Sequence, residues 1–344
     1  MDATTLSLLD AEPNTNSFAP AMLFPEMELF GGRLPIELVR SRGALLRRSR
    51  PGQSRDVQLL NLTNGCAHRS PFCPCRGNLA SASPVRFLTG APEVLAEELQ
   101  SGTVLPRAVQ ISPWSDPFLA VEDIQQATTS VVRVLAENNI EAWMMTRSEI
   151  APQILDALLP MREWIKIRIP LATLDESIRH LLEPLSAPSE TRLRQIRELK
   201  SLGFSVQVAL EPLLPGITDT KVNVIGILEQ LADLDVRQLG IGYLTLTSGM
   251  TEVISELLAP SGRDVLALNP YNHGPVRREM GVGQVRYLAK TSRQRSYAQV
   301  MAWGASLGIQ VSVSAASNPD FTREVLTMER QEPPRFLSGA FPRR

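Results

Sequence analysis

The chain has 344 residues, of which 43% are hydrophobic, and its formal net charge is −1. No apolar run approaches the roughly 20 residues that cross a bilayer, and the chain does not open on the charged and apolar segments of a secretory signal. These features exclude a membrane protein and predict a soluble, cytoplasmic protein, built as one large α/β domain with appendages.

Residues 1–50 are predicted to form an irregular N-terminal arm. The first 30 residues are rich in Pro, Asn, Ser and Thr and show no sustained periodicity. The organisation changes at Asp56, where the short apolar run 57–62 is stopped by Thr63, Asn64 and Gly65. This pattern predicts a buried strand that leads into a loop.

That loop contains all three cysteines of the chain, Cys66, Cys73 and Cys75, within ten residues. Three cysteines cannot staple a chain of this size, so we expect reduced thiols rather than disulfides. Thiolates are the soft ligands of iron–sulfur clusters and of zinc. His68 completes a Cys3His set, but the spacing Cys-x-His-x4-Cys-x-Cys is not a familiar zinc pattern.

Predicted strands and helices alternate after the loop. Six βα units of this kind indicate a parallel sheet with right-handed crossovers, either a barrel or an open wound sheet. We expect an α/β fold with a partial (β/α)6 TIM-like barrel of parallel strands over residues 51–250. The strands are expected at 57–62, 108–112, 140–145, 165–169, 205–210 and 236–242, and the helices at 92–100, 122–138, 150–159, 191–202 and up to 231.

Residues 251–344 are predicted to form a C-terminal α/β extension. A helical segment at 292–307 and a strand-like segment at 309–313 are expected to close the open bottom or side of the barrel. The extension also contains a locally basic stretch, which is either a solvated face or a phosphate-binding surface. Its basic residues are Arg277, Arg278, Arg286, Lys290, Arg293 and Arg295.

The cysteine loop resembles the cluster loop of radical S-adenosylmethionine (SAM) enzymes, in particular the spore photoproduct lyase-like branch. A typical loop of that branch reads Gly-Cys-x-His-x-Cys-x-Tyr-Cys-Tyr-Ala-Arg. Two positions differ here, because Ser70 replaces the middle cysteine and Cys75 replaces the alanine. The spacing is therefore Cys-x6-Cys-x-Cys. The matching residues are Gly65, Cys66, His68, Phe72, Cys73 and Arg76.

The resemblance continues over roughly residues 56–247. Ser115-Asp116-Pro117-Phe118 looks like the Thr-Asp-Pro-Tyr segment after the second strand of that branch, and Thr146-Arg147-Ser148 looks like the Thr-Lys-Ser that ends its third strand. Pro212-Leu213-Leu214-Pro215-Gly216 resembles the Pro-x-Ile-Pro-Gly after its fifth strand. These motifs are moderately specific singly and more specific in series.

The resemblance implies that Cys66, Cys73 and Cys75 hold a [4Fe-4S] cluster with one iron left open for SAM. Reductive cleavage of SAM then gives a 5′-deoxyadenosyl radical, with electrons from a donor such as a ferredoxin or flavodoxin. The expected activity is that of a radical SAM lyase or transferase. Its substrate is unidentified, and nucleic acid is one candidate.

The resemblance also implies SAM-binding roles. Ser115 and Asp116 would lie near the amino group of SAM, and Ser148 would lie in the same site. Arg147 stands where the branch has a lysine thought to meet the carboxylate, which a guanidinium can bind bidentately. The alternatives are a helix cap for Ser115 and Asp116 and a surface ion pair for Arg147. Tyr243 either faces the substrate or packs in the core.

The shifted cysteine leaves two readings of the loop. Either Cys75 is the third iron ligand, or Ser70 is a weak oxygen ligand and Cys75 is a free thiol that donates a hydrogen atom. A second function also stays open. In that case the chain is a catalytically diverged barrel with a structural Cys3His zinc site, acting as a binding or scaffold protein.

Overall fold

The structure is a computed structural model and describes residues 5–6, 36–48, 56–73, 85–102, 105–247, 249–279, 283–314 and 318–321. Its main sheet has eight strands among these residues, in the order β15-β11-β10-β9-β8-β7-β4-β3. All neighbouring strands are parallel except the β3–β4 pair. The strands are β3 (Arg47–Arg48), β4 (Val57–Leu60), β7 (Ala108–Ile111), β8 (Glu141–Met145), β9 (Ile165–Pro170), β10 (Ser205–Leu213), β11 (Gln238–Tyr243) and β15 (Gln310–Val313).

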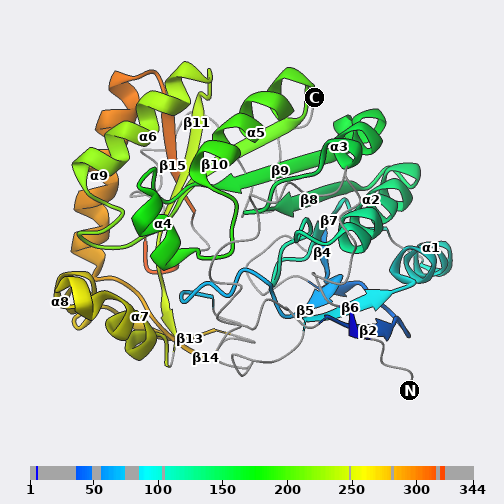
Figure 1. Ribbon diagram of the computed structural model, residues 1–344, viewed down its shortest axis with the longest axis horizontal. Coiled ribbons are helices and arrows are strands. Elements are labelled where there is room, and N and C mark those ends of the chain that lie inside the picture. The colour runs from blue at the N-terminus through cyan, green and yellow to red at the C-terminus, as the bar shows by residue number, and fades with distance from the viewer. Residues whose placement is uncertain are drawn as a thin grey trace.

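Helices connect the parallel strands and cover the outer face of the curved sheet (Figure 1). The reason is visible in β9, where Ile165, Ile167 and Ile169 are fully buried in the main core cluster together with helix residues. Side chains alternate along a strand, so Lys166 and Arg168 lie on the opposite, inner face. The helices are α1 (Ala91–Ser101), α2 (Glu122–Glu137), α3 (Pro152–Leu158), α4 (Glu176–Leu182), α5 (Ser189–Ser201) and α6 (Lys221–Asp233).

This architecture confirms the predicted partial TIM-like barrel. The expected strands are all present in the sheet, and their bounds differ by a few residues, with β10 continuing to Leu213. α4 has no predicted counterpart. It begins at a cap in which the Asp175 carboxylate accepts hydrogen bonds from the backbone N–H groups of Ser177 and Ile178.

The C-terminal extension adds a strand to one side of the barrel. β15 pairs with β11 in parallel, and helix α9 packs beside it. A three-stranded antiparallel sheet, β12-β14-β13, and two helices of this region were not predicted. The unpredicted elements are β12 (Leu246–Thr247), α7 (Met250–Leu258), α8 (Asp264–Leu268), β13 (Val276–Glu279) and β14 (Gly283–Arg286), whereas α9 (Lys290–Ser306) matches the helix expected at 292–307. Short 3₁₀ helices span Leu159–Trp164, Ala259–Ser261 and Asn269–Tyr271.

A small sheet, in the order β1-β2-β6-β5, lies beside the start of the barrel (Figure 1). Two of its strands fall within residues 1–50, so the prediction of an irregular arm is wrong for that part of the segment. β2 pairs with β6 in parallel, and this pairing with a later strand is what orders it. The strands are β1 (Thr5–Leu6), β2 (Ile36–Arg40), β5 (Thr63–Asn64) and β6 (Val85–Thr89).

The three-region division at residues 50 and 250 stays a prediction. Within the described ranges, none of the helices is both long enough and apolar enough to cross a bilayer.

Candidate active site

The cysteine loop follows β4 and β5, and the structure describes two of its thiols, Cys66 and Cys73. Cys66 and Cys73 are both half-buried. Burial raises the pKa of the Cys66 thiol to about 12, and the negative charges of Asp116 and Cys73 add to the rise. Cys66 and Cys73 are thus electrostatically coupled within this loop. A bound metal would favour the thiolate over the thiol.

The third predicted ligand, Cys75, lies outside the described residues, as does Arg76. Ser70 is buried and its carbonyl accepts a hydrogen bond of 3.0 Å from the backbone N–H of Cys73. No group of three metal-ligating side chains is found among the residues that the structure describes. The two thiols that it does describe are soft donors, which is the kind of ligand that iron–sulfur clusters take.

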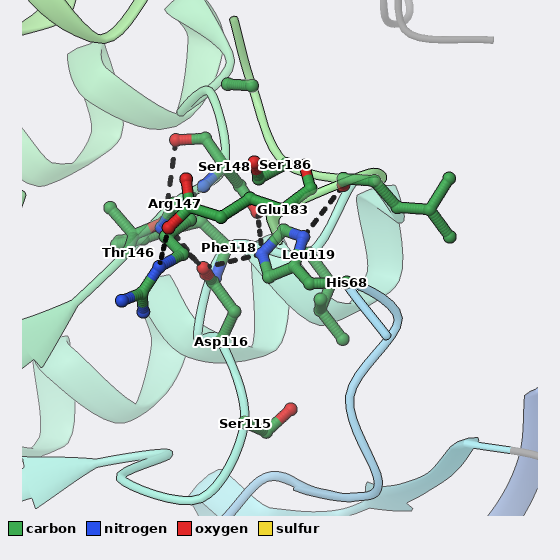
Figure 2. Close-up of polar contacts among 12 residues, drawn as sticks. His68, Ser115, Asp116, Phe118, Leu119, Thr146, Arg147, Ser148, Glu183 and Ser186 are labelled. Atoms are coloured by element: carbon green, nitrogen blue, oxygen red, sulfur yellow. Dashed lines mark hydrogen bonds and ion pairs between the residues drawn. The ribbon is translucent and has the colours of Figure 1, made fainter. Parts of the chain in front are cut away.

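His68 is held by both of its ring nitrogens (Figure 2). Nδ1 lies 2.8 Å from the carbonyl oxygen of Leu185, and Nε2 lies 2.9 Å from Oδ2 of Asp116. Both ring nitrogens thus contact oxygen atoms, one of the Leu185 carbonyl and one of the buried Asp116 carboxylate. His68 is therefore an anchor of the loop, and it does not serve as the fourth ligand of a Cys3His zinc site.

Asp116 lies at the centre of the site, after β7. Its Oδ1 accepts hydrogen bonds from the Phe118 backbone N–H and the Thr146 hydroxyl, both at 2.8 Å, and its Oδ2 accepts from His68 and from the Arg147 backbone N–H at 2.7 Å. Burial favours the neutral acid, but these donors outweigh it and hold the pKa of Asp116 below its ordinary value. The carboxylate ties the loop to the ends of β7 and β8.

Arg147 follows β8 and is fixed by a buried carboxylate. Its Nε donates to Oε1 of Glu183 at 2.7 Å, and its guanidinium carbon lies 5.5 Å from the ring centre of Phe72 in the cysteine loop. Glu183 also accepts from Arg192. Burial of Glu183 opposes its ionisation, but the charges of Arg192 and Arg147 dominate and lower its pKa to about 2.

Glu183 and Arg192 form a buried ion pair, and neither was among the residues predicted for the site. The structure shows that the pair also orients Arg147, and the spacing of Glu183 from Arg147 along the chain carries no signal of this contact.

The remaining predicted residues take different places. Ser115 lies beside the loop, where its hydroxyl donates to the Gly65 carbonyl at 2.9 Å. Ser148 is buried, with its hydroxyl 3.2 Å from Nε2 of His68. Tyr243 is buried away from these groups, and its hydroxyl donates to Asp219 at 2.6 Å. Ser115, Asp116, Arg147 and Ser148 are thus brought together, and Tyr243 is not.

Comparison with known proteins gives two kinds of relative. No family model matches the chain. A spore photoproduct lyase complexed with dinucleoside spore photoproduct superposes with a TM-score of 0.63 and 14% identity, covering 80% of this chain and 82% of that one. A variant of the same enzyme with bound AdoMet gives 0.63 and 16% identity over 80% of this chain and 81% of that one.

Two curated proteins are similar in sequence. The uncharacterized protein ORF301 of Acidianus two-tailed virus is 25% identical over 225 residues, which is 59% of this chain and 72% of that protein. The radical SAM Nα-GlyT isomerase of Pseudomonas phage M6 is 25% identical over 173 residues, or 49% of this chain, and the match spans only 35% of the isomerase.

These comparisons confirm the resemblance drawn from the sequence. The chain has the α/β fold of radical SAM enzymes, and its sequence is similar to one of them. The arrangement of its strands and helices is similar to that of spore photoproduct lyase.

Proposed function

We propose that this chain is a radical SAM enzyme, with a [4Fe-4S] cluster held by Cys66, Cys73 and Cys75. The cluster and SAM together would supply the carbon radical that starts the reaction. The residues of the chain bind SAM, orient it and keep the loop in place. The zinc alternative is not favoured, because both nitrogens of His68 already carry hydrogen bonds to acceptors.

The guanidinium of Arg147 is the observation that carries this proposal. Glu183 fixes Nε, and the two outer nitrogens have no hydrogen-bond partner among the described residues. Figure 2 shows this outer end of Arg147 directed away from Glu183 and His68. A fixed guanidinium with two unused N–H groups, placed against Phe72 of the cysteine loop, suits the carboxylate of SAM.

Asp116 then has a positioning role in this proposal. Its oxygens accept hydrogen bonds from donors in the loop and after β8. Its contribution is therefore to fix the positions of Arg147 and His68 relative to each other. Ser115 and Ser148 lie next to that network, Ser115 at the Gly65 carbonyl and Ser148 at Nε2 of His68. We propose that they line the SAM site, as the resemblance implies.

Nucleic acid is the substrate class that we propose. The structural relative is complexed with a dinucleoside, and part of the predicted basic stretch forms an exposed surface here. Arg277 and Arg278 on β13 and Arg286 on β14 are exposed, whereas Arg293 is buried against Asp320. Exposed arginines on one hairpin suit phosphate groups.

Anaerobic reconstitution with iron and sulfide tests the proposal. We expect a brown protein with about four irons per chain that cleaves SAM when a ferredoxin, a flavodoxin or dithionite supplies electrons. A colourless protein that holds one zinc would refute it. Cys75→Ala separates the two readings of that residue, since loss of iron identifies a ligand and retained iron with lost turnover identifies a hydrogen-atom donor.

A further inference from the structure

A charged pair lies on the inner face of the barrel, on strands next to the proposed SAM site. Arg168 of β9 is almost fully buried, with 6% of its side chain exposed, and Glu211 of β10 retains 22%. The inner face of a TIM-like barrel is ordinarily filled by apolar side chains. Glu211 lies near the carboxyl ends of the strands, where such barrels bind ligands. Its carboxylate is therefore a candidate for contact with a ligand.

The pairing geometry leaves Glu211 with acceptor capacity. Nε of Arg168 donates to Oε1 at 3.0 Å and Nη2 donates to Oε2 at 2.8 Å. This fork occupies the two neighbouring lone pairs of the carboxylate. The lone pairs that remain point apart. Glu211 can therefore accept one further N–H, but not two parallel ones.

The neighbouring strand keeps the space around this pair open. A Cβ at Gly240 of β11 would lie 3.2 Å from Nη2 of Arg168, and one at Gly242 would lie 3.5 Å from Oε2 of Glu211. The β10–β11 register also shifts between Leu210 and Leu213. Irregularities of this kind re-aim side chains next to active sites, and here the shift contains Glu211.

Glu211 and Arg147 lie at the same end of the sheet, because the Thr146 backbone N–H donates to the Arg168 carbonyl at 3.0 Å and Arg168 pairs with Glu211. Burial opposes the charge of Arg147, but Glu183 and then Glu211 and Asp116 raise its pKa above the ordinary value. The Glu211 carboxylate is thus within electrostatic reach of the guanidinium that we assign to SAM. A group bound at Glu211 would therefore lie at the same end of the barrel as the proposed SAM site.

We propose that Glu211, oriented by Arg168, accepts a hydrogen bond from a ring N–H on the Watson–Crick edge of the substrate base. This inference rests on the proposed nucleic-acid substrate. Ring N–H groups are the most acidic donors on the base edges and match a carboxylate acceptor. Thymine and guanine have one there, whereas cytosine and adenine have a ring nitrogen that is itself an acceptor.

The test uses the dinucleotides d(TpT), d(GpG), d(CpC) and d(ApA) as probes, with binding measured by titration calorimetry. We expect the wild type to bind d(TpT) and d(GpG) about ten-fold more tightly than the other two, as for one hydrogen bond to a charged acceptor. Glu211→Gln should abolish this difference. A wild type without the preference, or a variant that retains it, would overturn the proposal.

A second arm needs no variant and covers the case in which Glu211→Gln does not fold. d(TpT) methylated at N3 lacks the ring N–H, and the wild type should bind it no better than d(CpC). Equal binding of methylated and unmethylated d(TpT) would overturn the proposal. The matched control is Glu141→Gln. Glu141 begins β8 at the opposite end of the sheet and pairs with Lys166, so this variant should keep the preference.

The outcome is separable from that of the proposed function, because dinucleotide binding requires no cluster. A protein that cleaves SAM but shows no base preference retains the proposed function and loses this inference. A protein that shows the base preference but binds no iron retains this inference and loses the proposed function.

Discussion

The contacts of His68 distinguish between the two chemistries that the cysteine loop could support, iron–sulfur and zinc. A zinc-bound imidazole needs one nitrogen without hydrogen, but both nitrogens here face acceptors, Leu185 and Asp116. Ligation would leave a buried carbonyl or carboxylate without its donor, which costs about 1–3 kcal/mol or more. The same residue that completes a Cys3His set in the sequence is thus an anchor in the structure.

Arg147 carries the sharpest prediction at this scale. Arg147→Met is expected to weaken SAM binding by about 10- to 100-fold, because hydrogen bonds from a charged donor contribute about 1.5–3 kcal/mol. Arg147→Lys keeps the charge without the fork and should retain binding to within about ten-fold. Equilibrium dialysis of labelled SAM against the anaerobic, iron-loaded protein measures both.

Arg194→Met is the control for this measurement. Arg194 pairs with Glu149 at 2.6 Å but is 61% exposed, and a surface pair of this kind contributes little. Its loss should leave SAM binding unchanged. If Arg147→Met binds SAM as tightly as the control does, Arg147 is a structural ion-pair residue only.

Strands β9, β10 and β11 are coupled by side-chain packing. Gly240 and Gly242 of β11 leave room for the ion pair between Arg168 of β9 and Glu211 of β10. Gly240→Ala is expected to lower the free energy of unfolding by about 1–2 kcal/mol, since the added methyl group crowds the Arg168 guanidinium. Urea unfolding followed by circular dichroism measures this change.

Gly226→Ala provides a control of opposite sign. Gly226 lies within α6, and its added Cβ would meet only Leu174 at an ordinary 3.9 Å. Alanine is the better helix former by about 1 kcal/mol, so the variant should be more stable than the wild type. A Gly240→Ala protein as stable as the wild type would show that Arg168 has room to move.

The elements that could be predicted are those whose sequence signals lie within the element itself or next to it in the chain. Val57–Leu60 and Ile165–Pro170 are short apolar runs bounded by turn or helix signals, and both strands were found. Ile36–Arg40 was missed because its pairing partner is Val85–Thr89, far along the chain. His68 shows the same limit in the site, since it contacts the carbonyl of Leu185, 117 residues away.

At the scale of the whole molecule, one polar network joins segments that are far apart in sequence. Asp116 connects the cysteine loop with the ends of β7 and β8. Glu183 continues this connection through Arg147 and Arg192 to the start of α5. The network is buried, so its charges depend on one another. Removing one member leaves its partner buried and uncompensated, which destabilises proteins by about 3–5 kcal/mol.

The acid limb of the stability curve tests this dependence. The pKa of Glu183 is lowered to about 2 by Arg192 and Arg147, well below its value in the unfolded chain. A lowered pKa contributes stability that is complete above the unfolded value and is lost as the pH falls toward the folded value. We therefore expect the free energy of unfolding to decline between about pH 5 and pH 2, with roughly 3 kcal/mol of the decline coming from Glu183.

Glu183→Gln should be less stable than the wild type at pH 7, because Arg147 and Arg192 lose their counter-charge. It should also show a shallower decline in acid, since the titrating group is gone. The control is Glu190→Gln, at an exposed position in the first turn of α5. Its free energy of unfolding should decline with falling pH as steeply as that of the wild type. Urea unfolding at pH 7, 5, 4 and 3 compares the three proteins. If the free energy of unfolding falls equally steeply with pH in Glu183→Gln and in the wild type, protonation of Glu183 is not what destabilises the network in acid.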